Sequence, residues 1–252
     1  MRSPSLGRIV KRGVAALIYA VLKALVTRVS LVIWRPTVEG RENIPLHGPV
    51  ILASNHLSFI DSMLIPIVAP RRVAFIAKAE YFEKPGLKGR FMAAFFTAIG
   101  AVPVRREVHR AAREALETSL AVIESGVAFG IYPEGTRSPD GRLYRGRPGV
   151  GWLALKSGLP VIPVGIHGTR QVLPPGRVVP RPGRIELRIG APLEFPPEVL
   201  GAPPGKARRL IAEQVMAAIK ALSGQEYVHM YASDRKAELA AAGPVTRRPW
   251  RR

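Results

Sequence analysis

Short segments, most of them continuously apolar, alternate with helical patterns along most of the chain. The segments that predict strands are residues 37–40, 50–53, 73–77, 101–104, 127–132 and 161–166. The stretches that predict helices are residues 61–68, 89–99, 107–124, 150–156 and 206–222. Strands that are apolar on both faces are typical of a parallel sheet covered by helices. We therefore predict an α/β fold, a single domain with a mostly parallel central sheet flanked by helices.

Two regions toward the C-terminus depart from this alternation. Residues 185–189, IELRI, alternate apolar and polar positions, which predicts an edge strand. They lie in a stretch rich in Pro and Gly, residues 174–204, which we interpret as loops of the same domain. The domain is predicted to cover residues 35–225. Residues 226–252 end in an Ala-rich and then Pro- and Arg-rich sequence, and we predict a disordered basic tail.

The N-terminal segment is apolar but does not have the pattern of a membrane span. Lys23 and Arg28 interrupt the apolar residues 13–34, whereas a span needs about 20 largely uncharged residues. On a helix most of the basic residues of this segment fall on one stripe, opposite an apolar face. We therefore predict that residues 1–34 form an amphipathic helix in a membrane interface, with Trp34 and Tyr19 at headgroup level. The alternative is a helix buried against the domain.

Charge and composition limit the partners. The formal net charge is +20, which favours nucleic acid, an anionic membrane surface or an acidic protein. The chain has no cysteine, so disulfides and zinc–thiolate sites are excluded. It also lacks metal-binding spacings such as H-E-x-x-H. We expect no metal and no cofactor.

A polar cluster, SNHLSFID, directly follows the second predicted strand. In it, His56 and Asp61 are five residues apart, close enough for a turn to bring the carboxylate onto the imidazole. Such a pair can act as a general base, in which the carboxylate fixes the tautomer and stabilises the imidazolium. Ser58 lies between them, but the chain has no G-x-S-x-G nucleophile motif. We therefore expect His56 to activate an external alcohol, without a covalent intermediate.

Three cations occupy the ends of other predicted strands. These are Lys78, Arg105 and Arg137, the last within YPEGTRS. Because parallel strands end at the same edge of a sheet, the three cations are expected to converge and to bind a phosphate. Gly135 permits a close approach of the backbone to an anion, and Glu134 is placed to hold a hydroxyl or to order Arg137.

Four motifs occur in order within residues 35–190. They are N-H-x4-D at residues 55–61, G-A-V-P-V-R at residues 100–105, Y-P-E-G-T-R-S at residues 132–138 and V-I-P-V at residues 161–164. Together they resemble the glycerolipid acyltransferases, specifically the bacterial 1-acyl-sn-glycerol-3-phosphate (lysophosphatidic acid) acyltransferases. The first motif alone is weak, whereas the four in this order are specific.

The resemblance implies a role for each motif residue. His56 is implied as the general base, and Asp61 as the residue that orients it. Lys78, Arg105 and Arg137 are implied as ligands of the acceptor phosphate. The other implied substrate-binding residues are Asn55, Ser58, Glu134, Gly135, Thr136 and Pro163, the last on the acyl-chain side.

The resemblance also implies the partners and the location. The donor is expected to be acyl-CoA or acyl carrier protein, the acceptor a lysophospholipid and the product phosphatidic acid. The enzyme is expected at the cytoplasmic face of the membrane, monotopic or peripheral, with no nucleic acid bound. The second motif is Val-Pro-Val where the family is often aromatic, which leaves another lysolipid or polar lipid acceptor open. A basic nucleic-acid-binding protein is the alternative of a different class.

Overall fold

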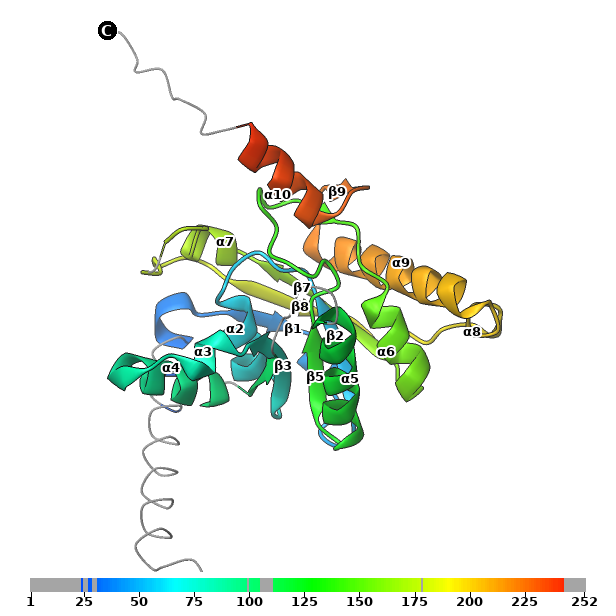
Figure 1. The fold of residues 1–252 in the computed structure, drawn as a ribbon, viewed down its shortest axis with the longest axis horizontal. Coiled ribbons are helices and arrows are strands. Elements are labelled where there is room, and N and C mark those ends of the chain that lie inside the picture. The colour runs from blue at the N-terminus through cyan, green and yellow to red at the C-terminus, as the bar shows by residue number, and fades with distance from the viewer. Residues whose placement is uncertain are drawn as a thin grey trace, which may run out of the picture.

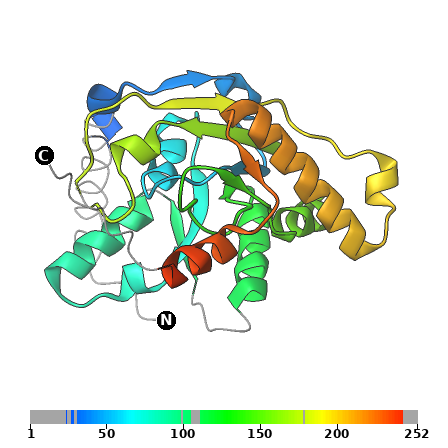
Figure 2. The same cartoon turned by 90° about the horizontal axis from the view of Figure 1, so that it is seen from above.

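In the computed structural model, which describes residues 24, 27–28, 31–98, 100–104, 111–177 and 179–242, a seven-stranded sheet carries helices on both faces (Figures 1 and 2). The strand order is β1-β8-β7-β2-β5-β3-β4, and all neighbours are parallel except β7 and β8. The strands are β1 (Thr37–Glu39), β2 (Val50–Ser54), β3 (Val73–Lys78), β4 (Ala101–Val104), β5 (Ala128–Ile131), β7 (Val161–His167) and β8 (Glu186–Ile189). The predicted α/β fold with a mostly parallel sheet is confirmed.

The helices connect these strands as the sequence pattern predicted, with several short additions. They are α2 (Asp61–Val68), α3 (Glu80–Glu83), α4 (Gly86–Ala98), α5 (Ala111–Glu124), α6 (Gly149–Ser157), α7 (Thr169–Val172), α8 (Pro197–Leu200), α9 (Pro204–Ser223) and α10 (Ala232–Ala241). A 3-10 turn, η1 (Arg41–Asn43), and a two-stranded ribbon of β6 (Leu143–Tyr144) and β9 (Tyr227–Val228) complete the described elements.

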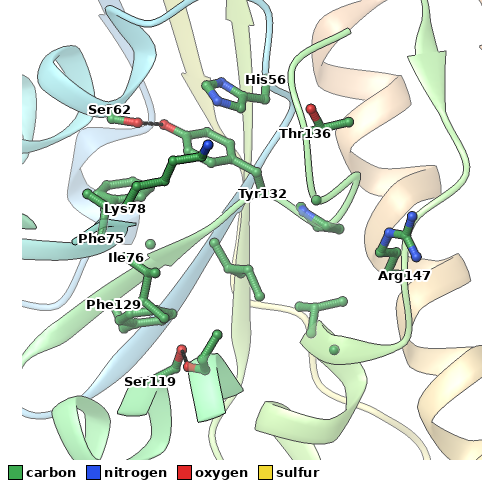
Figure 3. Close-up of a pocket in the computed structure, with 18 of the residues that line it drawn as sticks. His56, Ser62, Phe75, Ile76, Lys78, Ser119, Phe129, Tyr132, Thr136 and Arg147 are labelled. Carbon is green, nitrogen blue, oxygen red and sulfur yellow. Dashed lines mark hydrogen bonds between the residues drawn. The ribbon is translucent and has the colours of Figure 1, made fainter. Parts of the chain in front are cut away.

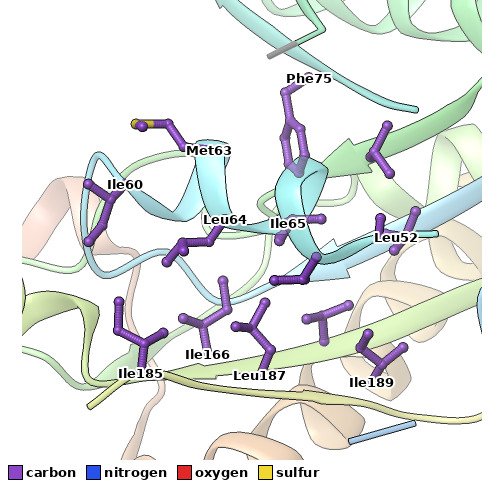
Figure 4. Packing of buried hydrophobic residues seen from close by; sticks show 14 of the residues in the cluster. Leu52, Ile60, Met63, Leu64, Ile65, Phe75, Ile166, Ile185, Leu187 and Ile189 are labelled. Carbon is purple, nitrogen blue, oxygen red and sulfur yellow. The ribbon is translucent and has the colours of Figure 1, made fainter. Parts of the chain in front are cut away.

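Alternate residues of the strands feed two separate cores. In β2, Leu52 packs toward α2 with Leu64 and Ile65, as Figure 4 shows. Its neighbour Ile51 faces the other way, into the core beneath α6 and α9. Each of these side chains is at most 2% exposed, and full burial of such a side chain stabilises the fold by roughly 1.5–3 kcal/mol. Burial on both faces explains why β2 is apolar throughout.

The prediction that residues 185–189 form an edge strand is wrong. Strand β8 lies between β7 and β1, and β1 is the edge strand on that side of the sheet. The polar residues of β8 are accommodated on one face of the sheet, where Arg188 pairs with Glu186 and with Glu39 of β1. The alternation of apolar and polar residues therefore indicates a strand with one face open to solvent. It does not indicate a strand that lacks a neighbouring strand on one side.

The prediction of a disordered tail from residue 226 is also wrong over most of its length. Strand β9 pairs with β6, and helix α10 follows it with Ala232 fully buried (Figure 1). An Ala-rich sequence favours a helix, and contacts with the body of the chain hold this one in place. Residues 243–252 lie outside the described part.

Most of the predicted N-terminal helix, residues 1–34, lies outside the described residues. The described helices include none that is long and apolar enough to cross a bilayer. Trp34 was predicted at headgroup level, but it is only 7% exposed and its indole N–H donates to the carbonyl of Arg181. Trp34 therefore belongs to the domain. Just before it, Leu31, Val32 and Ile33 are exposed.

Candidate active site

The carboxyl ends of β2, β3 and β5 meet at one edge of the sheet, where a cavity of about 550 Å³ opens (Figure 3). This is within the usual size of small-molecule sites. Polar residues line one part of it, namely His56, Ser62, Lys78, Thr136, Arg137 and Arg147. Its apolar part is lined by side chains that include Phe59, Phe75, Ile76, Phe96, Leu116, Phe129 and Ile131. The cavity thus suits a molecule with a charged head and an apolar chain.

The predicted His56–Asp61 pair is present. His56 Nδ1 lies 2.9 Å from Asp61 Oδ2, which also accepts 2.7 Å hydrogen bonds from the backbone N–H groups of Leu57 and Ser58. The side chain of Asp61 is fully buried, whereas that of His56 is 15% exposed. Because a carboxylate only accepts hydrogen bonds, the proton of the imidazole lies on Nδ1. Nε2 therefore keeps the lone pair that a general base needs.

Tyr132 supports the imidazole from below. Its ring stacks on that of His56 with 3.8 Å between centroids and 10° between planes, and on the other side it contacts Phe75 (Figure 3). The phenol pairs with the hydroxyl of Ser62 at 2.9 Å. Burial, followed by the charge of Asp61, raises the pKa of Tyr132 well above its ordinary value, so the phenol stays protonated. The aromatic contacts and the carboxylate together hold the imidazole in one orientation.

A glycine on β5 leaves room for the stack of His56, Tyr132 and Phe75. A Cβ on Gly130 of β5 would lie 2.0 Å from Cζ of Phe75, so no side chain fits where that ring crosses the strand. Any larger residue at this position would displace the ring of Phe75. The absence of a side chain at Gly130 therefore preserves both the apolar part of the cavity and the stack beneath His56.

Two of the predicted phosphate ligands line the cavity. Lys78, at the end of β3, extends toward Tyr132 and His56 in Figure 3, and its nearest carboxylate is that of the exposed Glu80 at 3.9 Å. Arg137 lines the cavity from the loop after β5. Arg105 lies outside the described residues, so its predicted role stays a prediction.

Gly135 and Thr136, also predicted, line the cavity. Gly135 has φ +73°, a backbone conformation that favours glycine, and its N–H closes a turn by donating to the carbonyl of Tyr132. That N–H is therefore already used inside the protein. The turn, and not the amide of Gly135, is what directs Thr136 and Arg137 toward the cavity.

Three residues predicted to bind substrate are buried away from the cavity. The Asn55 side chain joins β2 to β7, because it accepts from Ile166 N–H and donates to Ile166 C=O and to Gln225. The Ser58 hydroxyl donates to the carbonyl of Leu173. Pro163 is a buried residue of β7, paired with β2. These three residues therefore support the structure around the cavity and do not line it.

Glu134 likewise does not reach the cavity, contrary to its predicted contact with the acceptor. It is 1% exposed, and its two oxygens accept the backbone N–H groups of His56 and Tyr144. Burial raises the pKa of Glu134 to about 7, against the opposing effect of these two hydrogen bonds. The carboxyl group ties the loop of the first motif to β6, so it positions His56 through the backbone.

Sequence reasoning missed several residues at this site. The role of Tyr132 as the support of His56 is one, although it lies within a recognised motif. Arg147 lines the cavity after β6, and Lys236 of α10 donates a hydrogen bond to the hydroxyl of Thr136. The only sequence feature that could have indicated Arg147 is that it is a basic residue close to the Y-P-E-G-T-R-S motif. Lys236 is 100 residues from its partner, and no local pattern marks it.

A family model described as Acyltransferase matches residues 35–167. A chloroplastic 1-acyl-sn-glycerol-3-phosphate acyltransferase of Brassica napus is 32% identical over 144 residues, which is 57% of this chain and 40% of that protein. The enzyme of the same name from Bacillus subtilis is 27% identical over 62% of this chain and 72% of its own length.

One solved structure extends the likeness to most of the fold. The crystal structure of the 1-acyl-sn-glycerophosphate acyltransferase PlsC from Thermotoga maritima superposes with a TM-score of 0.61 at 29% identity, over 88% of this chain and 83% of that one. In contrast, the matched region spans about two fifths of the length of the Brassica relative. The family match contains all four motifs and every residue that lines the cavity.

Proposed function

This chain belongs to the acyltransferase family, and on that premise we propose that it transfers a fatty acyl group from a thioester to the sn-2 hydroxyl of 1-acyl-glycerol-3-phosphate, giving phosphatidic acid. The observation that carries the proposal is the His56–Asp61 pair beside a cavity that is lined by cations and by apolar side chains. The names of the relatives from Brassica napus, Bacillus subtilis and Thermotoga maritima support the substrate.

The proposed reaction is a single displacement. Nε2 of His56 takes the proton of the acceptor hydroxyl as its oxygen attacks the thioester carbonyl. The tetrahedral intermediate then breaks the C–S bond, and the imidazolium returns the proton to the leaving thiolate. Asp61 stabilises the imidazolium between these two steps. Ser58 takes no part as a nucleophile, because its hydroxyl is buried and donates to Leu173.

The cations at the cavity are proposed to bind the acceptor phosphate. Lys78 and Arg137 approach the cavity from two different strand ends, and Arg offers the planar, bidentate geometry that phosphate oxygens accept well. We include Arg105 on the basis of its motif. The acyl chains are proposed to lie against the apolar lining, where Phe75 and Phe129 are prominent in Figure 3. The donor is either acyl-CoA or acyl carrier protein.

An acceptor panel tests the proposal. Membrane-reconstituted protein is incubated with oleoyl-CoA and with several lysolipids, and products are identified by mass spectrometry. We expect phosphatidic acid from lysophosphatidic acid and at least about tenfold less product from lysolipids whose phosphate carries a further headgroup, because that headgroup screens the phosphate from the cations. Preference for another lysolipid would keep the chemistry and replace the acceptor. No consumption of any thioester would refute the function.

Association with an anionic membrane is proposed as well. Lipid acceptors and products require a site open to a bilayer, and the chain carries a net charge of +20 and exposes Leu31, Val32 and Ile33 where the N-terminal segment joins the domain. We propose monotopic or peripheral binding at the cytoplasmic face. Nucleic-acid binding would not account for the four family motifs, so acyl transfer is favoured over that alternative.

Removal of residues 1–30 is expected to weaken binding to phosphatidylglycerol vesicles at least about tenfold, since each basic residue near such a surface contributes about 1 kcal/mol. The deletion ends before Trp34 because that side chain is buried in the domain. Vesicle co-flotation measures the bound fraction. Removal of residues 243–252, which include four arginines, is the matched control. An equal loss in both variants would show that net charge alone is responsible.

A further inference from the structure

The C-terminal segment after α9 is fastened to the loop that carries the YPEGTRS motif. Arg145 N–H donates to the carbonyl of Met230, and β9 pairs with β6. Arg147, which lines the cavity, donates to the hydroxyl of Ser233 and lies 4.9 Å over the ring of Tyr231. These contacts fix α10 beside the polar part of the cavity. The family match ends at residue 167, so this segment contributes to the site from outside it.

Two neighbouring cations of α10 have different surroundings. Arg235 has carboxylate partners, with Glu238 at 2.9 Å and Asp140 at 3.8 Å. Lys236 donates instead to the hydroxyl of Thr136, and it forms no salt bridge with any carboxylate of the described residues. Lys236 is half-buried, so solvent only partly stabilises its charge.

The guanidinium of Arg137 repels the charge of Lys236. Burial lowers the pKa of Lys236, the nearby guanidinium of Arg137 lowers it further, and Glu134 opposes them. Glu134 is not a direct partner, because it forms no salt bridge with Lys236 and its two oxygens accept from the backbone of His56 and Tyr144. An anion held between Lys236 and Arg137 would offset their repulsion, and Thr136 offers a hydroxyl at the same place.

We propose that Lys236 is a further phosphate-binding residue of the active site, acting with Arg137 and Thr136 on a phosphate monoester of a substrate. The inference rests on the proposed function, since it names a residue for the same site. The phosphate belongs either to the lysophosphatidic acid acceptor or to a CoA donor. Helix α10 thereby becomes part of the substrate site and sets its preference for a phosphate group.

Kinetics of the full-length Lys236→Gln variant test the proposal. We expect the KM for the substrate whose phosphate is bound to rise about tenfold, because a charge-assisted hydrogen bond is lost from a half-exposed position. The Arg137→Gln variant is the positive comparison. The Lys220→Gln variant removes an exposed lysine from the last turn of α9 and is the matched control. Lys236→Arg should stay within about threefold of the wild type, since the charge remains.

The two phosphate sources give different patterns. A rise in the KM for lysophosphatidic acid alone identifies the acceptor phosphate. A rise with oleoyl-CoA, absent with a phosphate-free oleoyl thioester of N-acetylcysteamine, identifies the donor. Unchanged KM values in Lys236→Gln, or an equal loss in Lys236→Arg, would overturn the inference. Thermal melts check that each variant is folded.

Binding of glycerol 3-phosphate, measured by calorimetry, separates this inference from the proposed function. It requires no turnover. If the wild type acylates no lysolipid yet binds glycerol 3-phosphate more tightly than Lys236→Gln does, the proposed function fails and the phosphate site stands. If the wild type makes phosphatidic acid and Lys236→Gln matches it in both assays, the function stands and the role of Lys236 is refuted.

Discussion

Replacement of His56 by alanine is expected to lower kcat for acyl transfer by about 10²- to 10⁴-fold, the usual contribution of a positioned general base. The reason is geometric. Nε2 is the nitrogen left for the acceptor hydroxyl, because Nδ1 is held 2.9 Å from Asp61. The side chain packs on Tyr132 and is partly exposed at the cavity, so its removal should leave the fold intact. Initial rates and thermal melts measure the two effects.

A second histidine provides the control for this variant. His47 is exposed in the turn before β2 and has no proposed role in binding or catalysis. His47→Ala should therefore keep the wild-type kcat. Added imidazole should restore part of the activity of His56→Ala, because it can occupy the space above the Tyr132 ring. Turnover of His56→Ala within a few-fold of the wild type would remove His56 from the mechanism.

The site residues that could be predicted from the sequence are those placed by the carboxyl ends of the strands. His56, Lys78 and Arg137 each follow an apolar segment, and parallel strands bring such positions to one edge. Helix α2 was predicted with its observed bounds, because Asp61 opens an apolar helix directly after the motif. Local pattern and sheet topology were therefore sufficient to place the His56–Asp61 pair and two of the cations.

The direction in which a motif side chain points could not be predicted. Asn55, Ser58 and Glu134 have the polar atoms that a ligand would need, but in the structure these atoms satisfy buried backbone groups. A buried amide or carbonyl costs free energy unless it is paired, so a polar residue beside a strand end often serves the backbone first. Sequence alone gives the residue type and does not distinguish these two uses.

Contacts between segments that are far apart in the sequence could not be predicted either. Lys236 reaches Thr136 across 100 residues, and Gln225 reaches Asn55 across 170. Lys236 lies in an Ala-rich segment next to a Pro- and Arg-rich end, and that composition favoured a prediction of disorder. Its order depends on the β6–β9 ribbon and on Tyr231, neither of which has a signal in its own local sequence.

Replacement of Asp61 by asparagine is expected to lower kcat by about 10²- to 10⁴-fold, and it separates the charge of the carboxylate from its hydrogen bonds. Asp61 Oδ2 accepts from His56 and from the N–H groups of Leu57 and Ser58. In the variant the amide oxygen must take this position, because an NH₂ group there would face two backbone donors. The Nδ1–H tautomer of His56 is then kept, and only the negative charge is lost.

The same replacement should have a measurable cost in stability. Asp61 Oδ1 is buried with no hydrogen-bond partner among the described residues, so the NH₂ group of asparagine would be buried there unpaired, at about 1–3 kcal/mol. Denaturant unfolding measures this, with Asp234→Asn on the exposed face of α10 as the control. Asp61→Ala should cost more, because it leaves the N–H groups of Leu57 and Ser58 without an acceptor. A folded Asp61→Asn protein with wild-type kcat would show that the charge of Asp61 contributes nothing to catalysis.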